Sequence, residues 1–128
     1  MDTGHKRSLT SVLKLLNDMG HNTNRLWNEI KSIIIKTFAS AQPILAHHYK
    51  SCQPDNYANN MCFEILGLDI ILDDALKPYL LEVNYTPSFT TDTPLDKLIK
   101  KSVVRDSLIL MNITNKSKNE IIDKSKEM

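Results

Sequence analysis

Apolar residues recur at intervals of three and four along the first third of the chain. The first such run lies between a serine and a glycine: Ser8, Leu9, Val12, Leu13, Leu16, Met19 and Gly20. This spacing places the apolar side chains on one side of a helix, with serine suited to its N-cap and glycine to its stop. We therefore predict a first helix between Ser8 and Gly20.

A broader apolar stripe predicts a second helix beginning at Asn24: Leu26, Trp27, Ile30, Ile33, Ile34, Phe38 and Ala41. The β-branched run at 33–35 is also compatible with a strand, but the helical spacing on both sides favours a helix. Pro43 is expected to end or kink this helix, because proline lacks an N–H and clashes with the preceding turn. The polar residues 51–60 are typical of a loop.

Residues 62–89, CFEILGLDIILDDALKPYLLEVNYTPSF, alternate with a period of two and predict a β-hairpin. If Asp74–Lys77 form a four-residue loop, a common hairpin length, Leu72 pairs with Tyr79. The same register sets Asp69 opposite Glu82 and Gly67 opposite Asn84. A slip of one residue would reverse both faces, so this register is strongly preferred.

The two faces of the predicted hairpin differ in character. One is apolar and is expected to pack on the helices: Leu66, Leu68, Ile70, Leu72, Tyr79, Leu81 and Val83. The other carries Asp69, Glu82 and Asn84, and the glycine opposite Asn84 is expected to leave open space for a ligand. By the same alternation Glu64 falls on the apolar side, which nothing in the pattern explains.

The three oxygen-bearing residues indicate a metal site. Partners directly opposite each other have Cβ atoms about 5 Å apart, which is repulsive for two carboxylates without a cation. Carboxylate oxygens are what Mg²⁺ uses when substrate phosphates complete its shell. The alternative is a solvated sheet face with no metal, because antiparallel sheets often have one wet face. The spacing alone does not decide between them.

The sequence Thr93-Pro94-Leu95-Asp96 predicts the start of a third helix: a capping hydroxyl, proline at the first position and an acid near the N-terminal dipole. Its expected buried side is Leu95, Leu98, Ile99, Ser102, Val103 and Leu110. Lys97, Lys101 and Arg105 form a basic stripe, which either receives an acidic polypeptide or phosphate or is a solvated polar face; we favour the latter. Residues 113–128 are polar and predict a frayed helix or a disordered tail.

Composition narrows the class of protein. The 128 residues are 41% hydrophobic and 24% charged with a net charge of +1, which fits one modest domain or part of a larger one. Neither sign dominates, so the charge gives no support for binding nucleic acid or an anionic membrane. No signal peptide or membrane-spanning run is evident, and we expect a cytosolic protein. His47, His48, Cys52 and Cys62 match no standard zinc spacing, which favours two reduced cysteines.

The stretch GLDIILDDALKPYLLEVNYTPSF closely resembles the C-terminal motif of the tubulin tyrosine ligase-like family of ATP-grasp enzymes. GHKRSLTSVLKLLNDMG and IIIKTFASAQPILAHHYKSC resemble that family too, most of all its polyglutamylases. The resemblance runs from about Gly4 to Asn112. It departs from the family pattern mildly, with Tyr85 at a permissive position and Thr86 in place of a common serine.

The resemblance implies an α+β protein with a partial ATP-grasp fold, in which an antiparallel hairpin packs with about three helices over residues 1–112. It assigns Asp69, Glu82 and Asn84 to Mg²⁺ and ATP, and lets Thr86-Pro87-Ser88 border the substrate. The implied reaction phosphorylates a glutamate γ-carboxylate in a tubulin tail, and the amine of an incoming glutamate then attacks the acyl phosphate. Implied partners are tubulin, microtubules, ATP and glutamate, and the implied location is the microtubule cytoskeleton, including a cilium or basal body.

The same resemblance implies that the chain corresponds to the last third of a catalytic core. The adenine pocket, phosphate-binding lysines and amino-acid-binding arginines of the family would lie in a preceding lobe, so the chain alone is expected to be inactive and to expose apolar surface. Two alternatives stay open: a non-catalytic member that binds tubulin or a partner, and a generic Mg²⁺- or phosphate-binding module from another ligase.

Overall fold

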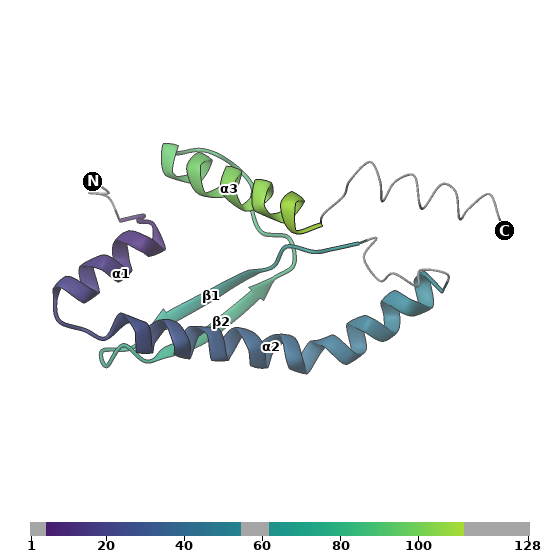
Figure 1. The fold of residues 1–128 in the computed structure, drawn as a ribbon, viewed down its shortest axis with the longest axis horizontal. Coiled ribbons are helices and arrows are strands. Elements are labelled where there is room, and N and C mark those ends of the chain that lie inside the picture. Colours follow the sequence, from purple (N-terminus) through teal and green to yellow (C-terminus); the bar gives the residue numbers. More distant parts are fainter. Residues whose placement is uncertain (1–4, 55–61, 112–128) are drawn as a thin grey trace. The chain divides into compact units, whose positions relative to one another are not determined.

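The computed structural model describes residues 5–54 and 62–111. Along the chain these form α1 (Leu9–Asp18), α2 (Thr23–Cys52), β1 (Gly67–Leu72), β2 (Pro78–Asn84) and α3 (Pro94–Met111) (Figure 1). They belong to two compact units, one with α1, α2 and the hairpin and one with α3. The α+β class predicted from the sequence is confirmed. The predicted tail at 113–128 and most of the predicted loop at 51–60 lie outside the described residues.

Helix α1 begins and ends as the sequence predicts. The Ser8 hydroxyl accepts a hydrogen bond from the Ser11 N–H at 3.1 Å. At the other end the N–H of Gly20 reaches the Asn17 carbonyl and the N–H of His21 reaches the Leu16 carbonyl. These two bonds form a Schellman motif, which requires a left-handed residue, and Gly20 has φ of +90°.

Helix α2 is longer than predicted. It is capped by the Asn22 side chain and runs through Pro43 to Cys52, including residues 33–35, so the helical interpretation of that run is confirmed. Of the two outcomes expected at Pro43, termination is wrong, and α2 continues as one curved helix (Figure 1). Proline removes a single hydrogen bond, which the neighbouring turns of a long helix tolerate at a cost of about 3 kcal/mol.

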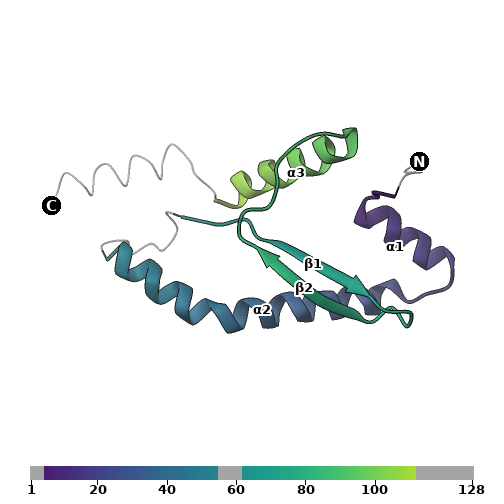
Figure 2. The same ribbon diagram turned by 180° about the vertical axis from the view of Figure 1, so that it is seen from behind.

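The core of the first unit is small. The buried apolar side chains of α2 are Leu26 and Ile30, at 4% and 8% exposure, and Pro78 at the start of β2 is buried as well. The N-terminal half of α2 lies beside the hairpin in both views (Figures 1 and 2). An apolar cavity of about 550 Å³ lies between these elements, lined by Leu9, Val12, Leu13 and Leu16 of α1, by Leu26, Trp27, Ile30 and Ile34 of α2, and by Leu68, Ile70 and Leu72 of β1, with Arg7 at its margin.

The hairpin is antiparallel, and its register is the predicted one at the end that carries the acids. Gly67 pairs with Asn84, Leu68 with Val83 and Asp69 with Glu82. A β-bulge follows, after which Ile70 pairs with Leu80, Ile71 with Tyr79 and Leu72 with Pro78. The extra residue of the bulge is Leu81.

The predicted pairing of Leu72 with Tyr79 is therefore wrong, because the loop has five residues, 73–77, instead of four. The Asp73 carboxylate accepts hydrogen bonds from the N–H groups of Ala75 and Lys77, at 3.0 and 2.8 Å. Leu76 adopts φ of +60°, and its N–H reaches the Asp73 carbonyl. This closure satisfies the backbone of a tight loop. It displaces the pairing by one residue, which the bulge then absorbs.

The bulge also corrects the predicted faces. Leu68, Ile70 and Leu72 line the apolar cavity as expected. Tyr79 does not share their face: it lies opposite Ile71, and both are exposed, at 43% and 51%. The bulged Leu81 is 64% exposed, so its predicted packing on the helices is wrong as well.

Helix α3 begins with the predicted cap. The Thr93 hydroxyl accepts a hydrogen bond from the Asp96 N–H at 3.1 Å, and the Asp96 carboxylate accepts one from the Thr93 N–H at 3.2 Å, which is the reciprocal arrangement of a capping box. Its predicted buried side is wrong: Leu98 and Leu110 are 68% and 85% exposed, and the residue buried on this helix is Asp96.

Candidate metal site on the hairpin

The predicted ligands lie at the end of the hairpin away from its loop. Asp69 is the third residue of β1, and Glu82 and Asn84 are the fifth and seventh residues of β2. Because side chains alternate along a strand, Glu82 and Asn84 share one face, and the register sets Asp69 on that face too. The structure thus brings together all three residues that the sequence predicted as a group.

Asn84 joins the two carboxylates. Its side-chain nitrogen donates to Glu82 Oε1 at 2.9 Å and approaches Asp69 Oδ2 at 3.5 Å, which is the limit of a hydrogen bond. The three side chains therefore meet at one place on the sheet. They provide two carboxylates and one amide, a set of oxygen donors suited to a hard cation such as Mg²⁺.

The carboxyl groups of Asp69 and Glu82 shift each other's pKa. A hydrogen bond with Glu82, followed by partial desolvation and the charge of Glu82, raises the pKa of Asp69 above its ordinary value. Hydrogen bonds from Asn84 and then from Asp69 lower the pKa of Glu82. The two pKa values are thus pushed apart, as happens for two acids that face each other.

Within residues 5–54 and 62–111, neither Asp69 nor Glu82 makes an ion pair with a lysine, arginine or histidine. Both side chains are open to solvent. Two ionised acids held face to face without a basic neighbour repel each other. A cation bound between them would attract both and offset that repulsion. The residues present therefore fit a metal bound by two carboxylates and an amide oxygen.

Gly67 was predicted to leave open space for a ligand, and this prediction is wrong. The space beside this glycine is not open, because a Cβ atom there would lie 3.2 Å from the Cβ of Pro87 and 3.7 Å from that of Asn84. The missing side chain instead lets the segment after β2 fold back onto the start of β1. Gly67 therefore shapes the border of the candidate site.

Sequence reasoning did not foresee the part played by Asp73. Hydrogen bonds from the N–H of Lys77, the Tyr79 hydroxyl and the N–H of Ala75 lower the pKa of this carboxyl group. An aspartate at a strand end that accepts from the N–H two residues on is the pattern of an Asx-turn, and this was the available signal. Asp73 organises the loop at the opposite end of the hairpin.

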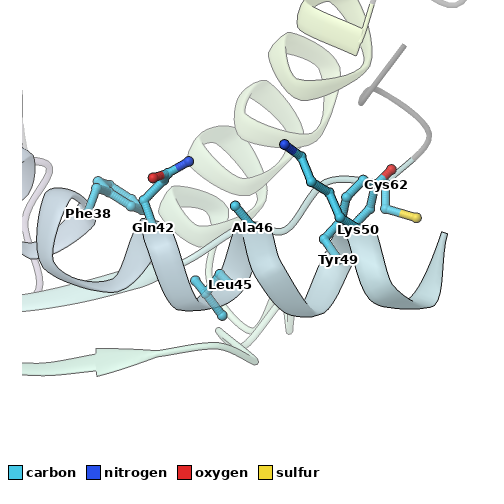
Figure 3. Close-up of a pocket in the computed structure, with 7 residues that line it drawn as sticks. All are labelled: Phe38, Gln42, Leu45, Ala46, Tyr49, Lys50 and Cys62. Carbon is cyan, nitrogen blue, oxygen red and sulfur yellow. The ribbon is translucent and has the colours of Figure 1, made fainter. Parts of the chain in front are cut away.

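The alternative zinc set does not form a cluster. Cys52 and Cys62 are both exposed free thiols, and the described residues contain no group of three or more His, Cys, Asp and Glu side chains that could hold a metal. Cys62 lines a hollow of about 460 Å³ on the second half of α2, together with Phe38, Gln42, Leu45, Ala46, Tyr49 and Lys50 (Figure 3). Neither histidine nor Cys52 is among these lining residues.

No helix within the described residues is long and apolar enough to cross a lipid bilayer.

Comparison with family models and comparison with individual proteins lead to the same family. The family model described as "Tubulin-tyrosine ligase family" matches residues 1–120. The chain is 71% identical over its whole length to a probable beta-tubulin polyglutamylase of Tetrahymena thermophila. It is 48% and 43% identical, over 98% of its length, to the tubulin polyglutamylases TTLL6 of Danio rerio and Homo sapiens. The chain spans 11%, 16% and 14% of the lengths of these three relatives.

Proposed function

The chain belongs to the tubulin-tyrosine ligase family, and from this premise we propose that it carries the Mg²⁺–ATP end of the active site of a tubulin polyglutamylase. The proposed activity is ATP-dependent ligation of glutamate to glutamate side chains of tubulin tails. The observation that carries the proposal is the meeting of Asp69, Glu82 and Asn84 on one face of the hairpin.

Each of the three residues has a distinct part in this proposal. Glu82, whose pKa is lowered by hydrogen bonds from Asn84 and Asp69, would supply one carboxylate to the cation. Asp69 would supply the second carboxylate, and Asn84 an uncharged oxygen from its amide. Bound Mg²⁺ would neutralise charge on the phosphates and align the transferred group. Two carboxylates leave room in the metal's shell for phosphate oxygens, as nucleotide-bound Mg²⁺ requires.

The proposal includes the setting of the reaction. ATP, glutamate and the acidic tails of tubulin are the proposed ligands, and the microtubule cytoskeleton is the proposed location. The family membership and the relatives' names support these statements. The chain's own contribution is the metal-binding hairpin and the helices that support it.

The metal role can be tested on the chain itself with Mn²⁺ as a paramagnetic probe. We expect Mn²⁺ to broaden the NMR signals of Asp69, Glu82 and Asn84 before those of Asp73 and Asp74, which lie in the hairpin loop. Glu82→Gln should remove this selective broadening. The matched control is Asp18→Asn, which neutralises an exposed acid at the end of α1 and should change nothing at the hairpin. Equal broadening at the loop and at the three residues would contradict the assignment.

The catalytic role needs a polyglutamylase catalytic domain that contains this segment. There Glu82→Gln should lower kcat for glutamylation by at least about a hundredfold, since changes one shell further from a metal already cost about 10–100-fold. Incorporation of radiolabelled glutamate into tubulin is the measurement, and Asp18→Asn is again the control. Unchanged incorporation by the Glu82→Gln enzyme would overturn the metal role and favour a purely tubulin-binding function.

A further inference from the structure

The second unit carries a cluster of lysines that the proposed chemistry does not use. Lys97, Lys100 and Lys101 lie on the first half of α3 and line a hollow of about 390 Å³ together with Phe89, Thr91 and Val104. The spacing of 97, 100, 101 and 104 places them on one face of the helix. This unit therefore presents a shallow surface with a basic rim and an apolar floor.

The lysines of this cluster are not equivalent. Lys100 Nζ donates to the Thr90 carbonyl and lies 3.9 Å from Asp96 Oδ1, so its charge is largely occupied within the unit. Asp96 is itself buried and belongs to the helix cap. Lys97 and Lys101 are exposed and make no hydrogen bond or ion pair with any other described residue. Two positive charges are thus left free on this face.

The apolar floor distinguishes this surface from an ordinary solvated helix face. Phe89 is 45% exposed and Val104 43% exposed, and both line the hollow together with the lysines. A ligand here would bury apolar surface while its charges met the ammonium groups. A bare phosphate cannot use the floor, whereas the methylene groups of a glutamate side chain can, since such chains lay their stems on apolar surface.

We propose that the face formed by Lys97, Lys101, Phe89 and Val104 docks a glutamate-rich segment of an acidic polypeptide. The charge complementarity of two free lysines and the apolar floor carry this inference. That the segment is a tubulin tail rests on the proposed function, but binding of an acidic polypeptide does not. The proposal thus assigns a binding role to Lys97 and Lys101 of the basic stripe, for which the sequence favoured a solvated polar face.

The test is binding of a short fluorescent polyglutamate peptide to the full chain, followed by fluorescence anisotropy at low salt. Lys97→Gln/Lys101→Gln should weaken binding about fivefold, because each exposed ion pair contributes about 0.2–1 kcal/mol. The matched control is Lys14→Gln/Lys36→Gln, which removes the same charge from exposed positions on α1 and α2 and should leave the affinity unchanged. Binding should also weaken as salt is raised.

Three results would overturn the docking proposal. The first is equal weakening by both double variants, which would indicate attraction by overall charge. The second is displacement of the peptide by inorganic phosphate at equal concentration, which would indicate a phosphate site. The third is equal binding of a polyglutamine peptide of the same length.

The docking face and the metal site can fail separately. Lys97→Gln/Lys101→Gln should weaken peptide binding while it leaves the selective broadening by Mn²⁺ at the hairpin as in the parent. Loss of peptide binding in the lysine variant with normal Mn²⁺ broadening supports the docking face whatever the fate of the ligase proposal. Circular dichroism of each variant confirms that α3 is intact.

Discussion

At the scale of single residues, three acids of the hairpin, Asp69, Glu82 and Asp73, lie in two different hydrogen-bonding environments. Asp69 and Glu82 face each other with Asn84 donating to both, and their pKa values are shifted in opposite directions. Asp73 is instead surrounded by donors that favour its ionised form. The same side chain is thus a ligand candidate at one end of β1 and a loop cap at the other, because the number of nearby N–H and O–H groups differs.

The cap formed by Asp73 predicts a pH dependence of stability. Its pKa is lowered in the folded chain, while in the unfolded chain it lies at about 3.9. The carboxylate therefore stabilises the fold above that value, and this contribution is lost as the pH falls through the lower, folded pKa. We expect Asp73→Asn to lower the melting temperature at neutral pH and to reduce the further loss on acidification. Thermal denaturation at a series of pH values measures both.

The neighbouring Asp74 supplies the control. Its side chain makes no hydrogen bond or ion pair within the described part of the chain. Asp74→Asn should leave the pH profile of the melting temperature as in the parent. If the two variants have the same profile, the loop is not held by the Asp73 carboxylate.

At the scale of elements, the sequence predicts the ends of the helices better than the pairing of the two strands. Ser8, Gly20, Thr93 and Asp96 act through local hydrogen bonds that spacing alone reveals. The hairpin register was predictable where the alternation of acids and aliphatics is strict, from Gly67 to Asp69. It was not predictable at the loop, because one side chain, that of Asp73, decides whether four or five residues turn the chain.

The site itself was predictable as a group of residues but not in its surroundings. The opposition of Asp69 and Glu82 follows from register alone. The contact of Gly67 with Pro87 depends on the path of an irregular segment, which has no periodicity to read.

The close contact at Gly67 predicts that a side chain there displaces the segment after β2. Gly67→Val places branched carbon atoms where a single Cβ would already be 3.2 Å from Pro87. We expect a loss of about 1–3 kcal/mol in the free energy of unfolding, the usual cost of overpacking. Chemical denaturation measures it. Combining the change with Pro87→Gly, which removes the opposing Cβ, should recover part of the loss, whereas simple additivity of the two variants would contradict the contact.

At the scale of the whole molecule, apolar surface exceeds the core that covers it. Leu26 and Ile30 are buried, while many large apolar side chains on every helix are exposed, among them Leu9, Ile35, Ile44, Leu45, Leu98 and Leu110. The expectation that the chain exposes apolar surface is confirmed for the described residues. A fold with so small a core depends heavily on each member of it.

This dependence predicts a large effect of one substitution. Leu26→Ala should cost the first unit about 2–5 kcal/mol, because Leu26 is 4% exposed. Trp27, the single tryptophan of the sequence, lies beside it and reports the unfolding of that unit by fluorescence. The control is Leu98→Ala on α3, where the side chain is 68% exposed and little should change. Equal denaturation midpoints for the Leu26→Ala variant and the parent would show that the unit is stabilised elsewhere.

The bulge at Leu81 bears on how this hairpin tolerates changes in length during evolution. Because Leu81 pairs with no residue of β1, removing it would let Leu80 and Glu82 become neighbours in a regular ladder with the same partners, Ile70 and Asp69. A homologue one residue shorter at this point would keep its acids face to face. A gap at Leu81 in an alignment of related sequences is therefore no sign that the metal-binding face has been lost.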